Sequence, residues 1–162
     1  MALPEKIGTK IFSPGDLLKR IDFWRTLGDK IVFTNGCFDI LHRGHIHLLL
    51  SCNTYGDRVV IGLNADTSVK KLKGDSRPVN DEKSRAILLA AIEFVDAIVI
   101  FEEDTPENLI LKIRPDVLVK GGDWKKEDIV GSCFVESYGG RVETIPYMKG
   151  FSTTEIIAKS KN

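Results

Sequence analysis

Short runs of consecutive apolar residues alternate along this chain with segments in which apolar residues recur every three or four positions. The apolar runs have the length of buried strands, and they predict strands at 30–34, 58–63, 97–101, 115–119 and 141–145. The periodic segments predict helices at 13–28, 44–55, 81–94, 106–113, 126–138 and 152–159, the fifth of them broken near Gly131. Ser13 and Asp81 are the expected N-caps of the first and third helices.

Strands that alternate with helices predict an α/β protein with a parallel sheet. The strands are almost entirely apolar, which indicates a sheet covered on both faces. We therefore expect a single doubly wound, Rossmann-like domain over residues 1–162 with a five-stranded parallel sheet, in which 1–29 form an N-terminal helical extension and 30–162 the catalytic core. Ligands of such sheets bind beyond the carboxyl ends of the strands, so the site is expected in the loops 35–44, 64–80, 102–105, 120–125 and 146–153.

Composition and charge narrow the classes of partner. Lysine plus arginine equals aspartate plus glutamate at 23 each, so no overall field favours nucleic acid or an anionic membrane. No apolar run approaches the roughly 20 residues of a membrane span, and the first ten residues lack a signal-peptide core. The three cysteines are odd in number and show no CxxC spacing, which predicts reduced thiols in a cytoplasmic protein.

The loop after the first predicted strand carries the strongest chemical signal. His42 and His45 stand three residues apart with Gly44 between them, where the second helix begins. A helix N-terminus offers unpaired N–H groups and partial positive charge to a phosphate, and histidines there can donate hydrogen bonds to phosphoryl oxygens. A metal site would need a third ligand, which the pattern lacks, and a dinucleotide site would need GxGxxG. We therefore predict a phosphate site and no protein-bound metal.

Two separated segments resemble the signatures of one family. The segment 42–45 resembles the HxGH signature of the cytidylyltransferase-like nucleotidyltransferases, and 150–157 resembles their second signature, a Ser/Thr-rich start to the last helix. The segments 64–66, 72–80, 101–106 and 119–124 resemble the adenylyltransferases that make ADP-heptose for bacterial lipopolysaccharide. The resemblance covers nearly the whole chain from about Ile31, without the sugar-kinase half with which that activity is often fused. It implies a stand-alone enzyme that transfers AMP from ATP to D-glycero-manno-heptose 1-phosphate.

The same resemblance implies roles for particular residues. The catalytic residues would be His42, His45 and Lys73, the lysine acting as a mobile cationic clamp in a loop. The ATP-binding residues would be Thr34, Asn35, Gly36, Phe38, Gly44, Arg85, Lys120, Gly121, Gly122, Ser152, Thr153 and Thr154. The sugar-phosphate-binding residues would be Asp39, Asp66, Asp123 and Trp124. Mg²⁺ is expected as the ATP complex, held largely by phosphates and water, and a homodimer is expected because relatives commonly form one.

Alternatives remain open at several of these positions. Lys73 could be a solvated surface lysine, Arg85 a surface partner of Asp81 or Glu82, and Asp39 a turn-forming residue. Two rival functions also remain. One is a cytidylyltransferase acting on glycerol 3-phosphate, although 147–149 read Tyr-Met-Lys where those relatives carry Arg-Thr-Glu. The other is a nucleotide-binding module without catalysis.

Overall fold

The computed structural model describes residues 4–148, 150–151 and 153–160. Six parallel strands form one sheet in the order β1-β4-β3-β2-β5-β6. The strands are β1 (Ile11–Phe12), β2 (Ile31–Gly36), β3 (Arg58–Asn64), β4 (Ala97–Phe101), β5 (Val117–Gly121) and β6 (Arg141–Ile145). The helices are α1 (Glu5–Gly8), α2 (Pro14–Thr26), α3 (Arg43–Asn53), α4 (Asp66–Lys73), α5 (Glu82–Ala90), α6 (Glu107–Ile113), the 3₁₀ helix η1 (Lys126–Asp128), α7 (Ser132–Ser137) and α8 (Thr153–Ser160).

The α/β class and the parallel sheet are confirmed, but the predicted number of five strands is wrong. The sixth strand, β1, pairs with β4 through Ile11 and Phe12 at the edge of the sheet. A strand of two residues is too short to produce a recognisable apolar run, so the hydrophobic pattern did not predict it. The segment predicted as a helical extension thus adds a strand to the sheet, and its helix α2 buries Leu17, Ile21 and Trp24 in the main core.

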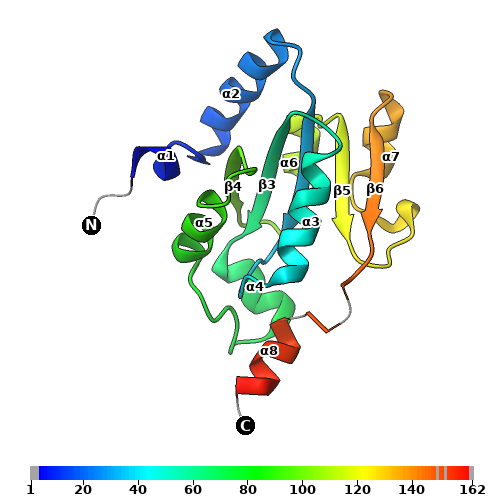
Figure 1. Cartoon of the computed structure of the whole chain (residues 1–162). Helices are drawn as coiled ribbons and strands as arrows, with labels where there is room; N and C mark the ends of the chain where they lie inside the picture. The colour runs from blue at the N-terminus through cyan, green and yellow to red at the C-terminus, as the bar shows by residue number, and fades with distance from the viewer. Residues whose placement is uncertain (1–3, 149, 152, 161–162) are drawn as a thin grey trace.

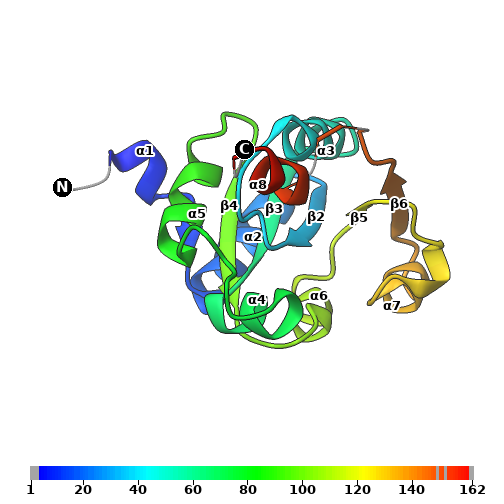
Figure 2. The same ribbon diagram turned by 90° about the horizontal axis from the view of Figure 1, so that it is seen from below.

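The sheet is covered on both faces, as the apolar strands predicted. Neighbouring residues of β2 point to opposite sides, because side chains alternate along a strand. Phe33 packs in the cluster that contains α2 and α6, whereas Val32 packs in a cluster with Cys52 of α3. Figure 2 shows α3 on one side of the sheet and α6 and α7 on the other. The two layers hold the strand ends, and with them the connecting loops, in fixed positions.

The structure contains a helix that was not predicted, and α5 ends at Ala90 rather than at Phe94. Helix α4 lies within the segment 64–80, which the pattern indicated as a loop, because only Ser68 and Val69 of its eight residues are buried. The break predicted near Gly131 in the helix at 126–138 is confirmed, because Gly131, at φ 86°, separates η1 from α7. The predicted N-caps are confirmed: the Ser13 side chain accepts a hydrogen bond from the Asp16 N–H, and the Asp81 side chain accepts one from the Ser84 N–H.

Aspartates at the amino ends of three strands help to hold the sheet in register. Each carboxylate accepts a hydrogen bond from a backbone N–H at the start of a neighbouring strand. The pairs are Asp57 with Lys30 at 2.9 Å, Asp96 with Val59 at 2.8 Å and Asp116 with Ile31 at 2.8 Å. Hydrogen bonds from backbone N–H groups to a carboxylate are among the stronger ones in proteins. These hydrogen bonds connect the amino ends of neighbouring strands. The loops expected to form the site lie at the opposite, carboxyl ends.

The order of the strands places the site. From β2 the chain moves through β3 to β4 on one side, and β5 and β6 then add on the other side of β2. The strand order therefore reverses between β2 and β5, which is where doubly wound sheets bind ligands. In Figure 1 the strand arrows point towards the end of the molecule where α4 and α8 lie.

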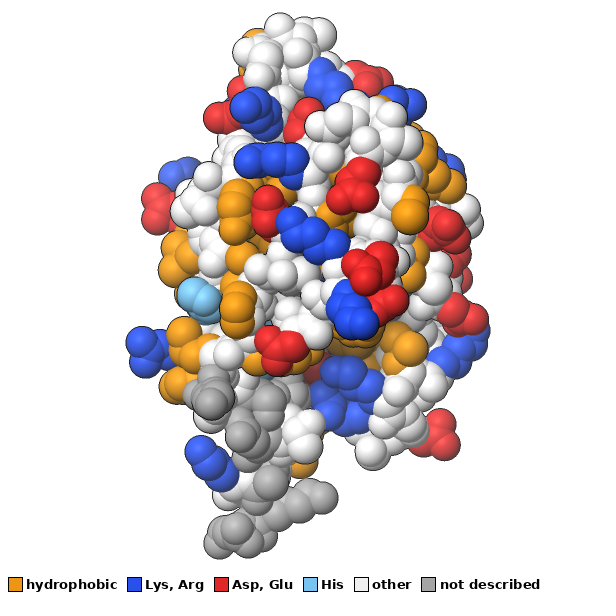
Figure 3. Space-filling view, turned by 90° about the vertical axis from the view of Figure 1, so that its right-hand side faces the viewer, with side chains coloured by type: hydrophobic (Ala, Val, Ile, Leu, Met, Phe, Trp, Pro, Cys, Tyr) orange, Lys and Arg blue, Asp and Glu red, His pale blue; other side chains and the backbone are white. Residues whose placement is uncertain are grey.

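The charge on the outer face agrees with the balanced composition. Figure 3 shows the side formed by β6 and α7, where basic and acidic side chains are interspersed and no patch of one sign is seen. Within the described residues, no helix combines the length and the apolar character that crossing a membrane requires.

Candidate active site

A cleft of about 870 Å³ lies beyond the carboxyl ends of β2 and β5. Its lining draws on the loop after β2, the start of α3, the end of α4, the end of β5 and the segment between β6 and α8. The predicted residues that line it are Asn35, Gly36, Phe38, Asp39, His42, Gly44, His45, Lys73, Lys120, Gly121, Trp124, Thr153 and Thr154. The cleft therefore brings together groups that are more than a hundred residues apart in the chain.

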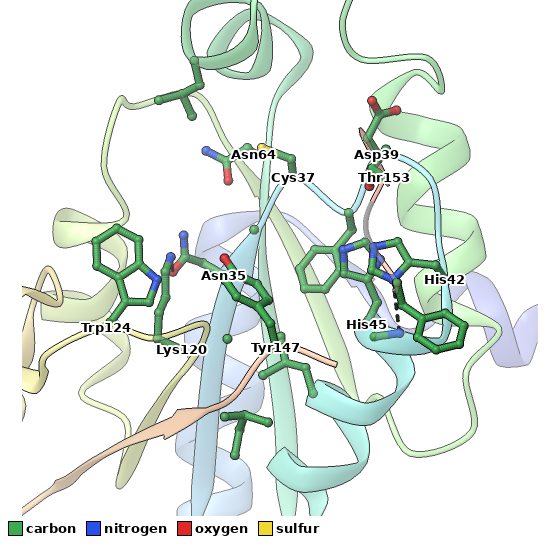
Figure 4. Close-up of a pocket in the computed structure, with 18 of the residues that line it drawn as sticks. Asn35, Cys37, Asp39, His42, His45, Asn64, Lys120, Trp124, Tyr147 and Thr153 are labelled. Carbon is green, nitrogen blue, oxygen red and sulfur yellow. Dashed lines mark hydrogen bonds between the residues drawn. The ribbon is translucent and has the colours of Figure 1, made fainter. Parts of the chain in front are cut away.

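His42 is the N-cap of α3, a position at which Ser, Thr, Asp and Asn are the usual residues. Its Nδ1 accepts a hydrogen bond of 3.1 Å from the Gly44 N–H (Figure 4). A nitrogen that accepts in this way carries no proton, so the proton of the neutral imidazole is on Nε2. The helix cap thus sets the tautomer of His42 and makes Nε2 a donor.

His45 lies one turn further along α3, and its ring stacks on that of His42. The ring centroids are 3.8 Å apart and the planes are inclined by 22°. On another side, the Phe38 ring lies 5.1 Å from His45. Burial lowers the pKa of His45 from 6.5 to about 3, and repulsion from a protonated His42 and from Lys73 acts in the same direction. His45 is therefore neutral at physiological pH and can donate one N–H.

Gly44 allows the two signature segments to meet. A Cβ at this position would lie 3.0 Å from the His42 ring and 3.2 Å from the Phe151 carbonyl oxygen, closer than most real contacts. The Arg43 guanidinium lies 5.5 Å from the centroid of the Phe151 ring, which adds a cation–π contact to the same junction. The start of α3 and the segment before α8 are thus in contact at the cleft. Ser152 lies outside the described residues.

Lys120 stands on the opposite side of the cleft from the histidines (Figure 4). From the end of β5 its Nζ donates a 3.2 Å hydrogen bond to Asn35 Oδ1 at the end of β2, so the contact spans the point where strand order reverses. The same Nζ lies 6.0 Å from the centroid of the Trp124 ring. Burial lowers the pKa of Lys120, while the nearby Cys37 acts in the opposite direction. A lysine held in this way supplies positive charge facing the cleft.

Lys73 is the second cation on the lining. It is exposed and is the last residue of α4, followed by Gly74 at φ 91°. The prediction that Lys73 stands in a loop is therefore wrong, because the preceding residues form a helix. It lies close enough to His45 for its charge to lower the pKa of that histidine.

Asp39 lines the cleft, but its carboxylate is directed to the loop 77–80. It accepts hydrogen bonds from Arg77 Nε, from the Val79 N–H at 2.7 Å and from the Asn80 N–H at 3.0 Å. Burial alone would raise the pKa of Asp39, but the bonds from Asn80, Arg77 and Val79 outweigh it and lower the pKa. The carboxylate is therefore ionised and occupied with holding this loop.

Arg85 is fully buried and does not line the cleft, unlike the surface arginine that one reading of the sequence allowed. Its guanidinium donates to the carbonyl oxygens of Cys37 at 2.6 Å, Asn64 at 2.8 Å and Asn80 at 3.0 Å. It also pairs with the Asp66 carboxylate at 2.7 Å. One side chain thus joins the ends of β2 and β3 to the start of α5.

Other predicted residues also lie away from the lining. Thr34 is fully buried within β2, and Gly122 is buried behind the lining at φ 121°. The Asp66 carboxylate forms an ion pair with Arg85. Asp123 is exposed and precedes Trp124 in the chain, but it does not line the cleft.

Some lining residues were not predicted as site residues, among them Asn64, Tyr147 and Phe151. Asn64 ends β3 as Asn35 ends β2, and this parallel was a signal that could have identified it. Tyr147 and Phe151 fall in the predicted loop 146–153, but nothing in their residue type indicates that they face the cleft.

Comparisons with known proteins agree with this geometry. The family model described as cytidylyltransferase-like matches residues 33–159. The bifunctional protein HldE of Nitrobacter hamburgensis is 51% identical over 160 residues, which are 99% of this chain and 32% of that protein. HldE of Koribacter versatilis is 51% identical over 150 residues, 93% of this chain and 31% of that protein. The chain thus spans about a third of the length of these curated relatives.

One solved structure is similar over much of the chain. A lipopolysaccharide core biosynthesis protein from Thermoplasma volcanium superposes with a TM-score of 0.65 and 27% sequence identity. The match covers 75% of this chain and 100% of that one.

Proposed function

This chain belongs to the cytidylyltransferase-like family, and on that premise we propose that it transfers AMP from ATP to D-glycero-manno-heptose 1-phosphate, forming ADP-heptose and pyrophosphate. The observation that carries nucleotidyl transfer is the stacked pair His42 and His45 at the N-terminus of α3, facing a cleft where the strand order reverses. The choice of a heptose phosphate is supported by the resemblance of four further segments to ADP-heptose adenylyltransferases and by 51% identity to HldE proteins over nearly the whole chain.

The reaction is an in-line displacement at the α-phosphorus of ATP. A phosphate oxygen of the sugar 1-phosphate forms a bond to this phosphorus, while the bond from the α-phosphorus to the bridging oxygen breaks. Pyrophosphate departs with the electron pair of that bond. Such a reaction needs no covalent enzyme intermediate, because positioning and neutralisation of charge lower the barrier.

The two histidines would supply hydrogen bonds to the phosphoryl oxygens. His42 donates from Nε2, since its Nδ1 is used by the helix cap. His45 donates as a neutral imidazole, since its pKa is about 3. The N–H groups at the start of α3 add partial positive charge at the same place. These donors exist before the substrate arrives, so little reorganisation is needed as charge develops.

The lysines would hold the triphosphate from other sides of the cleft. We assign Lys120 and Lys73 to its phosphates, with Thr153 and Thr154 at the start of α8, and Trp124 to the sugar phosphate. Arg85, Asp39 and Asp66 act indirectly, through the backbone segments that they hold. We assign residues 30–162 to the catalytic core and 1–29 to an N-terminal extension whose helix α2 packs against that core.

Magnesium would enter with the nucleotide. Among the described residues, no three or more histidine, cysteine, aspartate or glutamate side chains lie close enough together to coordinate a metal ion. This fits Mg²⁺, which keeps several waters and is usually bound through substrate phosphates with one or two carboxylates. Asp104 and Asp39 are the carboxylates on the lining, but Asp104 pairs with Lys71 at 3.0 Å and Asp39 holds the loop 77–80. Bound Mg²⁺ would neutralise charge on the triphosphate and on the departing pyrophosphate.

We further propose a cytoplasmic homodimer, which agrees with the need for ATP and with the oligomeric state expected of relatives. Sedimentation equilibrium of the purified protein tests the dimer, and a monomer at micromolar concentration would contradict it.

The function is tested by measuring pyrophosphate release with Mg²⁺, each of ATP and CTP, and each of heptose 1-phosphate and glycerol 3-phosphate. We expect turnover only with ATP and the heptose phosphate, and a loss of roughly 10²–10³ in kcat for His45→Ala. The matched control is His47→Ala, an exposed histidine of the same helix that does not line the cleft and should leave kcat unchanged.

Turnover with CTP and glycerol 3-phosphate would agree with the proposed mechanism but contradict the proposal that heptose 1-phosphate is the substrate. Binding of ATP without turnover of any pair would favour a non-catalytic module.

A further inference from the structure

Tyr147 is an aromatic residue of the cleft that the proposed chemistry leaves without a role. It follows β6 directly after Pro146, and the residue is 68% exposed although it lines the cleft. Figure 4 shows it between the side that carries Lys120 and Trp124 and the side that carries His45. A large aromatic surface that remains open inside a binding cleft is available to a ligand.

Gly122 holds one edge of the Tyr147 ring. A Cβ built at Gly122 would lie 2.9 Å from three atoms of that side chain, including its hydroxyl oxygen. Gly122 has φ 121°, a backbone conformation that other residues rarely adopt, and its N–H donates to the Ile145 carbonyl at 2.8 Å. The ring therefore lies against bare backbone at the end of β5, which leaves much of its surface open.

The other aromatic rings of the cleft already have partners. Phe38 lies 5.1 Å from the His45 ring, Lys120 lies 6.0 Å from the Trp124 ring, and Arg43 lies 5.5 Å from the Phe151 ring. Tyr147 makes no ring–ring or cation–π contact with any residue in the described ranges. Tyr147 is thus the aromatic residue of the described lining whose ring face makes no contact with another ring or with a cation.

We propose that Tyr147 is the platform on which the base of the nucleoside triphosphate stacks, and that it favours a purine over a pyrimidine. The inference rests on the proposed function in one respect, namely that the nucleotide occupies this cleft. With the phosphates held by the histidines and Lys120, a base on Tyr147 would lie beside them, close to the carboxyl end of β6. A purine presents a larger flat face than a pyrimidine, so stacking on the tyrosine contributes more to binding of ATP than of CTP.

Calorimetric binding of Mg–ATP and Mg–CTP, without any acceptor, tests this inference. We expect Tyr147→Ala to weaken ATP binding by roughly ten- to a hundredfold and CTP binding by less, whereas Tyr147→Phe keeps the affinity close to that of the unmodified protein. Gly122→Ala should also weaken ATP binding, because its methyl group meets the ring. Phe23→Ala removes another exposed aromatic residue, on α2 and outside the cleft lining, and is the matched control.

The outcomes are distinct from those of the turnover assay. Weakened ATP binding in Tyr147→Ala supports the inference even if heptose 1-phosphate proves not to be a substrate. ATP binding equal to that of the unmodified protein would overturn it, as would equal losses for ATP and CTP. A loss in Trp124→Ala but not in Tyr147→Ala would place the base on the indole instead. Failure of the unmodified protein to bind either nucleotide would overturn both proposals.

Discussion

The rings of His42 and His45 stack with their centroids 3.8 Å apart, so that a proton on one imidazole disfavours a proton on the other. The cap bond from the Gly44 N–H holds His42 in place, and burial keeps His45 neutral. The pair therefore presents N–H donors without requiring two positive charges in the same small volume. This arrangement suits a site that receives a triphosphate together with its metal ion.

The lowered pKa of His45 predicts that stability depends on pH. In the unfolded chain His45 binds a proton as pH falls below 6.5, but in the folded protein only near pH 3. The contribution to stability is therefore present above pH 6.5 and is lost progressively as pH falls from 6.5 towards 3. Between pH 7 and 5 the unmodified protein should lose about 2 kcal/mol more of its free energy of unfolding than His45→Gln does.

Urea titrations at pH 7, 6 and 5 measure this difference. His47→Gln serves as the control, because that histidine is exposed. Parallel pH profiles for the unmodified protein and His45→Gln would show that His45 titrates normally in the folded state.

Replacement of the buried Arg85 should reduce both stability and activity. Arg85→Met leaves the Asp66 carboxylate and three backbone carbonyls without their donor, so we expect a loss of about 3–5 kcal/mol in the free energy of unfolding. The loop that begins at Cys37 should also loosen, which lowers kcat more than it raises KM for ATP. Chemical denaturation and steady-state kinetics measure the two effects. Lys83→Met, at an exposed position of the same helix, should change neither, and a stable Arg85→Met would refute the buried-network account.

Lys120 should contribute to nucleotide affinity rather than to folding. Its Nζ makes one hydrogen bond of 3.2 Å, to Asn35. The free energy of unfolding of Lys120→Gln should therefore be close to that of the unmodified protein. Loss of a charged hydrogen bond to phosphate is expected to weaken ATP binding by about tenfold or more. Calorimetry with ATP measures this change, and Lys125→Gln, an exposed neighbour outside the lining, is the control. Equal affinities for the two variants would exclude Lys120 from phosphate binding.

Removal of Mg²⁺ should abolish turnover without unfolding the protein. If the ion arrives with ATP rather than being held by a protein cage, EDTA should leave the thermal midpoint of the nucleotide-free protein unchanged, because ligand binding raises stability only where the ligand is bound. Adding Mg²⁺ back should restore pyrophosphate release. A drop in the thermal midpoint on adding EDTA would instead reveal a structural metal. Differential scanning calorimetry with and without EDTA separates these cases.

The local features of this protein were accessible from the order of its residues. Strand and helix periodicities depend on neighbours within a few positions, as do the caps at Ser13 and Asp81, and these predictions are confirmed. The position of His42 and His45 at the start of a helix after the first long strand is a feature of the same kind. The short elements β1 and α4 were not predicted, because β1 has only two residues and α4 buries only two of its eight residues.

Only the tertiary structure decided which polar side chains face the cleft and which hold the loops around it. Arg85 reaches a carbonyl 48 positions away and Asp39 a backbone N–H 41 positions away, so both act behind the cleft wall. Tyr147 lines the cleft because the Gly122 backbone leaves room for its ring. A residue type indicates which bonds a side chain can make, but the partner depends on distances set by the packing of the whole sheet. The sequence therefore determined the fold class and the phosphate-binding signature, while packing determined how each charge and ring is used.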